Sequence, residues 1–194
     1  MCKLKSMIAL KDRIYIAEHD SHQDMLNELK IKDDYLGASK KFVRLELSPA
    51  DGDPFSDIDT WVLTVDQDIK PEWYSEEEYK PKAIEAVKEW AKTHIFVGIN
   101  GLKLSEGTNY YIKDCKDVEI CDSASVEAYG SASVKAYGSA IVFNSSVVTW
   151  KKQSSLILSE NATFKDNIGK VIYQSGDFKL VSVESGKAIG EANS

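Results

Sequence analysis

Residues 122–145 read DSASVEAY, GSASVKAY and GSAIVFNS, three consecutive units of eight residues. The preceding DCKDVEIC, residues 114–121, is a degenerate version of the same unit. Small apolar residues recur at the third, fifth and, in the first two units, seventh positions, and polar or aromatic residues alternate with them. Such alternation is typical of a strand with one buried face, and the Gly-Ser pairs favour turns. The stretch therefore predicts one strand per unit.

An eight-residue unit is too short to enclose a core alone, so we expect a β-solenoid with two units per turn, or three around a triangular turn. Inward Ala and Val suit a narrow interior that larger side chains would overpack. A meandering sheet is the alternative, although it would not demand near-identical inward residues. Beyond residue 145, Leu156 and Leu158 keep the alternation and could cap the stack. Residues 170–183 predict a terminal hairpin turned at 175–177.

The first half of the chain predicts a small α+β domain. Apolar runs at 7–10 and 14–17 flank Lys11-Asp12-Arg13 and indicate a hairpin. Ser21, three residues before Asp24, begins a helix of about two turns. Alternating or apolar runs predict strands at 42–47 and 61–65.

The strongest helix signal lies between residues 75 and 93. Ser75 and Glu78 form a capping box, and an apolar stripe follows it. We expect the main helix at 81–93, with the acidic turn before it continuous or slightly kinked at Pro81. Asn100-Gly101 favours a hairpin across 97–104.

These elements give the fold class α+β. We expect an acidic α+β domain at 1–105, a β-solenoid-like repeat domain with a C-terminal hairpin at 106–188, and a disordered tail at 189–194. The three cysteines are an odd number, and the N-terminus has no secretory pattern, which favours a reducing cytoplasm. No apolar run reaches the roughly 18 residues of a membrane span, so a soluble protein is expected.

The charge of the chain is concentrated in one segment. Residues 51–78 carry ten acidic residues and one base, a net charge of −9, whereas the whole chain carries −7. Such a segment repels a nucleic-acid backbone and attracts basic surfaces. We therefore expect a protein partner with a basic surface, and no direct nucleic acid or membrane. A solvated acidic edge that only maintains solubility is the simpler interpretation.

The candidate partner-binding residues combine acidic side chains with two tyrosines. Both tyrosines belong to the outward set of the octads, where they could stack on a sugar or base, anchor a protein interface, or cover the first domain. The full set is Asp51, Asp53, Asp57, Asp59, Glu76, Glu77, Glu78, Tyr129 and Tyr137.

No motif predicts catalysis, a cofactor or a firm metal site. His19 and His22, with carboxylates nearby, could offer zinc ligands, but they lack the i, i+4 spacing, and polar capping groups at a helix N-terminus are the simpler interpretation. The aspartates of 51–59 lack EF-hand spacing and favour turns. Cys115 and Cys121 are expected to be small buried side chains rather than nucleophiles. We therefore predict no enzyme activity.

Two segments carry a resemblance to known sequences. SASVEAYG and SASVKAYG, within 123–138, resemble Ala-x-Val-x-Ala-Tyr-Gly-Ser repeats of uncharacterised bacterial and phage proteins. FSDIDTWVLTVDQDIKPEWY, residues 55–74, is similar to a phage and prophage family with a Trp, a Val-Asp pair and a Pro-Glu-Trp-Tyr element in that order. The resemblance implies a mobile-element origin and supplies no catalytic residue.

The combined expectation is a non-enzymatic, phage-derived interaction protein in the bacterial cytoplasm. An acidic protein can occupy a basic nucleic-acid channel by placing carboxylates where phosphates would lie, as inhibitors of CRISPR or restriction systems do. The alternatives are a homo-oligomeric scaffold and a carbohydrate- or nucleotide-binding module.

Overall fold

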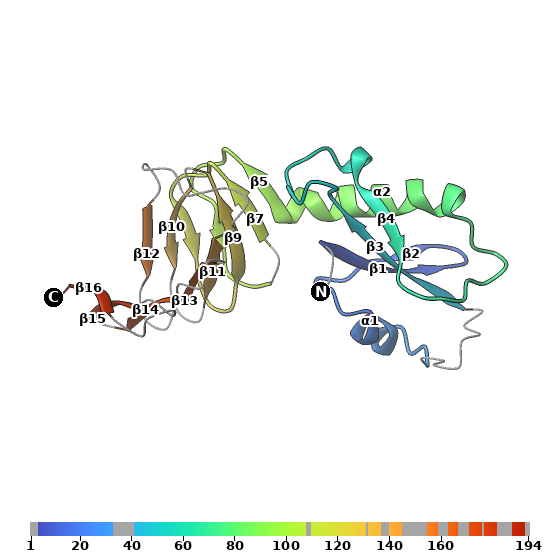
Figure 1. The fold of residues 1–194 in the computed structure, drawn as a ribbon, viewed down its shortest axis with the longest axis horizontal. Coiled ribbons are helices and arrows are strands. Elements are labelled where there is room, and N and C mark those ends of the chain that lie inside the picture. The colour runs from blue at the N-terminus through green and yellow to red at the C-terminus, as the bar shows by residue number, and fades with distance from the viewer. Residues whose placement is uncertain are drawn as a thin grey trace. The chain divides into compact units, whose positions relative to one another are not determined.

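The computed structural model describes residues 4–32, 41–107, 110–130, 132–136, 140–144, 155–158, 163–166, 171–175, 177–181 and 188–192. Within them the chain is a mixed α and β protein (Figure 1). It divides into two compact units, Met1–Thr93 (unit 1) and His94–Ser194 (unit 2). The sequence placed a boundary near residue 105, beyond the first strands of unit 2.

Unit 1 is built on an antiparallel sheet whose strands lie in the order β2-β1-β3-β4. The predicted hairpin is confirmed, since Ile8 pairs with Tyr15 across the turn. The two other predicted strands are confirmed as well. The four strands are β1 (Lys5–Leu10), β2 (Ile14–Tyr15), β3 (Phe42–Ser48) and β4 (Val62–Val65), with the short 3₁₀ helix η1 (Ile58–Thr60) before β4.

Two α-helices are described, and serine caps both of them. Helix α1 (His22–Glu28) begins after Ser21, whose hydroxyl accepts the Asp24 N–H. Helix α2 (Glu76–His94) begins after Ser75, whose hydroxyl accepts the Glu78 N–H at 3.2 Å. The acidic turn is continuous with the main helix, in line with one of the two expectations, and the helix therefore begins at Glu76 rather than at Pro81.

The helices cover opposite faces of the sheet in unit 1 (Figure 1). Ile8 and Phe42 pack against Leu26 of α1. On the other face, the Lys5 ammonium lies 4.9 Å from the ring centroid of Trp90 in α2. Because strand neighbours point to opposite faces, Ser6 lies on the α1 side of the sheet.

Unit 2 consists mainly of parallel strands in two sheets. The longer sheet contains β5 (Ile95–Val97), β7 (Tyr110–Lys113), β9 (Ser125–Tyr129), β11 (Ile141–Asn144) and β13 (Thr163–Asp166), followed by the antiparallel β14 (Val171–Ser175), β15 (Asp177–Val181) and β16 (Ala188–Ala192). The shorter sheet contains β6 (Lys103–Leu104), β8 (Val118–Ile120), β10 (Ser133–Ala136) and β12 (Ser155–Leu158).

The register of these sheets is sixteen residues, the length of two octads. Val126 pairs with Tyr110 on one side and with Val142 on the other. In the second sheet, Val118 pairs with Val134 at the same spacing. Successive octads therefore alternate between the two sheets. The spacing lengthens to twenty-two residues at the last parallel pairs, such as Ser133 with Ser155.

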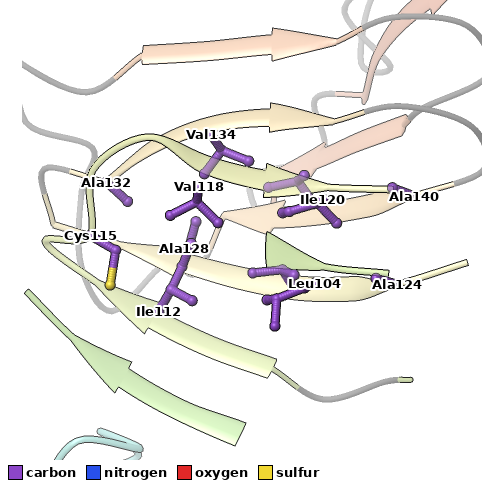
Figure 2. Packing of buried hydrophobic residues seen from close by; sticks show 12 residues of the cluster. Leu104, Ile112, Cys115, Val118, Ile120, Ala124, Ala128, Ala132, Val134 and Ala140 are labelled. Carbon is purple, nitrogen blue, oxygen red and sulfur yellow. The ribbon is translucent and has the colours of Figure 1, made fainter. Parts of the chain in front are cut away.

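Small apolar side chains from both sheets meet between them (Figure 2). Ala124, Val126 and Ala128 are fully buried, as the inward positions of the octad predict. Larger residues, Ile112 in β7 and Ile120 in β8, fill the same interior before residue 122. The buried cluster in this interior consists of Leu104, Ile112, Cys115, Val118, Ile120, Ala124, Val126, Ala128, Ala132, Val134, Ala140 and Val142.

The predicted hairpin at 97–104 is wrong. Val97 pairs in parallel with Lys113, and Lys103 pairs in parallel with Glu119, so the two segments lie in different sheets. Gly98 and Gly101 have positive φ values of 67° and 72°, and they turn the chain from one sheet to the other. The Asn-Gly signal therefore marks a corner rather than a hairpin.

The corners recur every eight residues and begin before the visible repeat. Asp114, Asp122 and Gly130 each start an octad with φ between 55° and 63°. Aspartate is among the few residues that tolerate this left-handed conformation, so it replaces glycine at the first two corners. The lead-in at 114–121 is consequently a structural octad.

The C-terminal elements agree in part with expectation. The terminal hairpin is confirmed, since Ser175 lies opposite Asp177 where β14 pairs with β15. The tail expected to be disordered from residue 189 contains most of β16, which pairs antiparallel with β15. Backbone pairing to an existing sheet edge is a stabilising contact that the composition of the tail does not reveal. Whether Leu156 and Leu158 cap the stack stays a prediction, because the structure describes the backbone of β12 but not these two side chains.

Candidate functional site

A buried lysine organises the segment that leads into α1. Lys5 is fully buried, and its Nζ lies 2.8 Å from Oδ1 of Asp20 and 2.7 Å from the carbonyl oxygen of Ala17. The Ser6 N–H also donates to Oδ1 of Asp20, at 3.3 Å. A buried ammonium is tolerated only when it is paired and hydrogen-bonded. Lys5 therefore holds residues 17–20 against β1 and fixes where the helix starts.

The first residue of that helix is His22, whose two ring nitrogens have different partners. Its Nε2 lies 3.0 Å from the carbonyl oxygen of Leu45, which can only accept, so Nε2 carries the hydrogen. Its Nδ1 lies 3.4 Å from Oδ2 of Asp66. The imidazole thus connects α1 to β3 through one nitrogen and to the end of β4 through the other.

Two carboxylates accompany this imidazole. Glu46 lies on the α1 side of β3 and is 9% exposed, whereas the Asp66 side chain is 61% exposed. Asp66 is anchored by its own N–H, which donates to the Arg44 carbonyl at 2.9 Å. One potential ligand atom from each of His22, Glu46 and Asp66 lies within 4.8 Å of the other two. The cluster is therefore enclosed by the sheet on one side and open beside Asp66.

The zinc pair considered from the sequence does not form. His19 Nε2 lies 3.0 Å from Oε1 of Glu28, away from the partners of His22. The Tyr15 hydroxyl donates to Oε2 of Glu28 at 2.6 Å, and this bond, followed by that of His19, lowers the pKa of Glu28. The same bond raises the pKa of Tyr15. The structure instead joins His22 to carboxylates far away in the sequence, which sequence reasoning missed.

Most aspartates of the predicted acidic surface stabilise turns. Oδ1 of Asp51, Asp53 and Asp57 each accepts the backbone N–H two residues later, at 3.0–3.1 Å. These Asx turns shape the loop before β4. Asp59 is held by Lys88, whose Nζ lies 2.8 Å from its carboxylate. In the described chain, the loop aspartates do not gather into a group of metal ligands.

The three glutamates in the first turn of α2 are exposed, and in the described part of the chain they make fewer contacts than the loop aspartates. Glu78 is paired with Lys82 at 2.6 Å, whereas no ion pair is found for Glu76 or Glu77 within the described residues. Burial, followed by the charge of Glu76, raises the pKa of Tyr74 to about 12. A shallow groove lies between this turn and η1. Its lining residues are Asp59, Glu77, Lys80, Pro81, Ile84, Glu85 and Lys88.

The proposed binding tyrosines belong to unit 2. Tyr129 is only 4% exposed, and its hydroxyl donates to Oε2 of Glu127 at 2.7 Å, so little of its ring is exposed for stacking on a sugar or base. Burial raises the pKa of Glu127, and the hydrogen bond from Tyr129 opposes that effect. Tyr137 lies outside the described residues.

Neither cysteine described in unit 2 has the environment of an activated nucleophile. Cys115 is buried in the interior, and its thiol lies 3.5 Å from the Phe96 carbonyl. Burial, followed by the charge of Asp122, raises the pKa of Cys121, which disfavours the reactive thiolate. Both cysteines are therefore assigned to packing.

Comparison with known proteins gives no match. No protein-family model, curated protein or solved structure matches the chain. None of the helices within the described ranges has both the length and the apolar character needed to cross a membrane. Support for a function therefore comes from the residues described above.

Proposed function

We propose that the protein is a non-catalytic binding protein whose acidic surface in unit 1 engages a basic surface of another protein. The observation that supports this proposal is the exposed pair Glu76 and Glu77 at the start of α2, with no ion-pair partner among the described residues. Because no neighbouring cation in the described part of the chain neutralises these two carboxylates, their negative charge can attract a basic partner. By contrast, Asp51, Asp53 and Asp57 are used for turns.

The groove beside these glutamates suits a lysine or arginine side chain. Glu77 and Glu85 supply carboxylates to its lining, while Ile84 and Pro81 supply apolar surface. A basic side chain buries its aliphatic stem on apolar atoms and keeps its charge on carboxylates. The groove residues Lys80 and Lys88 moderate the field, so recognition depends on the position of the charges as well as on their number.

Unit 2 is assigned the role of a rigid platform, and we infer that it is a β-solenoid with two octads per turn. The sixteen-residue register supports this inference. The combined proposal is a protein of mobile-element origin that occupies the nucleic-acid channel of a bacterial host protein, with a homo-oligomeric scaffold as the alternative. Carboxylates placed at phosphate positions would compete with nucleic acid for such a channel.

The test is a charge reversal confined to the unpaired glutamates. Glu76→Lys with Glu77→Lys changes the net charge by +4 and leaves the turn-capping aspartates intact. Glu89→Lys with Glu106→Lys makes the same change at exposed positions outside the acidic segment. Immobilised wild-type and variant proteins are compared for the bacterial proteins that they retain, measured by quantitative mass spectrometry at increasing NaCl.

The proposal expects a basic protein retained by the wild type and the control, released by salt, and lost from the Glu76→Lys, Glu77→Lys variant. Addition of DNA or RNA should displace the same protein. Equal retention by all three proteins would reject the acidic surface as the binding element.

A further inference from the structure

We propose that His22, Glu46 and Asp66 form a binding site for a divalent transition-metal ion, with zinc the best match to the donor set. The three residues offer one imidazole nitrogen and two carboxylates from α1, β3 and the end of β4. Imidazole favours zinc and its neighbours over magnesium and calcium, and carboxylates complete many zinc sites. This inference is independent of the proposed protein-binding surface.

The separation of the donor atoms fits one shared ion. Two ligands at about 2.1 Å from a tetrahedral zinc ion lie about 3.4 Å apart. Nδ1 of His22 and Oδ2 of Asp66 are 3.4 Å apart. The Glu46 carboxylate lies within the 4.8 Å that encloses all three donors, so a small side-chain rotation brings it to the same ion.

The hydrogen bond on the far side of the imidazole orients it for a metal. Because Nε2–H donates to the Leu45 carbonyl at 3.0 Å, a neutral His22 presents its lone pair on Nδ1, toward Asp66. Metal-binding histidines are typically held in this way by a backbone carbonyl or a carboxylate on the second nitrogen. The two carboxylates would balance the charge of a divalent ion.

A separate observation comes from Ser6. Its hydroxyl is buried and has no hydrogen-bond partner within the described part of the chain, which is costly unless something binds it. Ser6 lies directly opposite Glu46 in the β1–β3 register, on the same face of the sheet. A water bound at the site would satisfy this hydroxyl.

The surroundings leave the carboxylates available and the site accessible. Arg44, which shares this face of β3, directs its guanidinium over the Phe42 ring, 5.1 Å from the ring centroid, in the opposite direction along the strand from Glu46. The Asp66 side chain is 61% exposed, which provides a route for the ion and room for water as a fourth ligand. Binding would tie α1 to β3 and β4.

The experiment is a zinc titration of the full-length protein after removal of metals with EDTA, followed by calorimetry and by thermal unfolding. Mn²⁺ and Mg²⁺ are titrated in parallel. The test variants are His22→Gln and Asp66→Asn, and the matched control is His19→Gln, which removes a half-exposed histidine three residues away. Circular dichroism of each variant without metal verifies that it is folded.

We expect one zinc ion per chain for the wild type and for His19→Gln, with a higher unfolding temperature in the presence of zinc. Affinity should fall at least tenfold in each test variant, and Mg²⁺ should bind more weakly than zinc. Absence of zinc binding, equal affinity in Asp66→Asn, loss of binding in His19→Gln, or tighter binding of Mg²⁺ would each overturn the proposal. If zinc does not bind, His22 and Asp66 form an ion pair only.

Discussion

The two units bury very different side chains. The interior of unit 1 includes the fully buried Lys5 and Ser6 and the nearly buried Glu46. The interior cluster of unit 2 contains only apolar side chains, and the buried His94 at the start of unit 2 lies outside that cluster. In unit 2, equivalent positions of successive octads stack on one another, so each inward position is filled by a similar small apolar residue. A charged side chain in that interior would have no polar partner. Unit 1 has no such constraint. We therefore propose that the ligand-binding groups of the protein lie in unit 1.

The largest effect should come from breaking the buried charge of unit 1. Lys5→Met leaves Asp20 and the Ala17 carbonyl without their ammonium, and we expect a loss of about 3–5 kcal/mol in the free energy of unfolding. Urea unfolding followed by tryptophan fluorescence measures it, because Trp61 and Trp90 are buried in unit 1. Lys11→Met, at an exposed position of the same hairpin, should change stability by less than about 0.5 kcal/mol. Similar losses in the two variants would contradict the assigned role of Lys5.

A second effect should come from overfilling the interior of unit 2. Ala128→Leu adds three carbon atoms where Ala128 is fully buried, and we expect a loss of about 1–3 kcal/mol. Thermal unfolding followed by far-UV circular dichroism measures this loss. Lys103→Leu introduces the same side chain at an exposed position of unit 2 and should leave stability nearly unchanged. Tolerance of Ala128→Leu would mean that the interior is not closely packed.

The corners of the two units can be compared through two glycines. Gly52 in unit 1 and Gly130 in unit 2 both have positive φ, and alanine in this conformation costs about 1–2 kcal/mol. A Cβ on Gly52 meets no atom within 4 Å, whereas one on Gly130 would lie 2.5 Å from Oδ1 of Asp114. In thermal unfolding, Gly130→Ala should therefore be the more destabilising variant. Equal losses would show that the stacked corner adds nothing to the backbone strain.

The smallest effect should be a pH dependence in unit 2. Because burial raises the pKa of Glu127, its contribution to stability is fully present below its unfolded pKa and is lost as the pH rises through the folded pKa. Glu127→Gln keeps an acceptor for the Tyr129 hydroxyl and removes the charge. The variant should be slightly more stable than wild type at pH 7, and the difference should vanish near pH 4. A destabilised variant at pH 7 would contradict this sign.

Local signals in the sequence predicted much of the fold. The caps at Ser21 and Ser75 and the octad period each depend on residues close together in the chain, and the structure has all three features. Strand β7 was missed, and β5 and β6 were expected to pair as one hairpin, whereas β8 lies in the degenerate octad seen in the sequence. The signal is weak in this region because two corners use Asp114 and Asp122 and the interior uses larger residues than the octads. The recognisable sequence repeat therefore covers fewer residues than the eight-residue structural period, which begins earlier in the chain.

The candidate site was largely hidden from sequence reasoning. His22 was noticed, but Glu46 and Asp66 lie 24 and 44 positions further along and are brought to it by the register of β3 and β4. No feature of the sequence singles out Lys5, because nothing local indicates that segment 17–20 folds over it. Contacts between residues that are far apart in the sequence produce no local sequence pattern from which they could be predicted.

The assignment of ligand-binding groups to unit 1 is tested most directly by hydrogen–deuterium exchange with and without Zn²⁺. The account predicts slower exchange in residues 17–28, 42–48 and 62–66, which surround His22, Glu46 and Asp66. It predicts unchanged exchange in residues 110–130 of unit 2. Protection confined to unit 2, or no protection in either unit, would contradict the assignment.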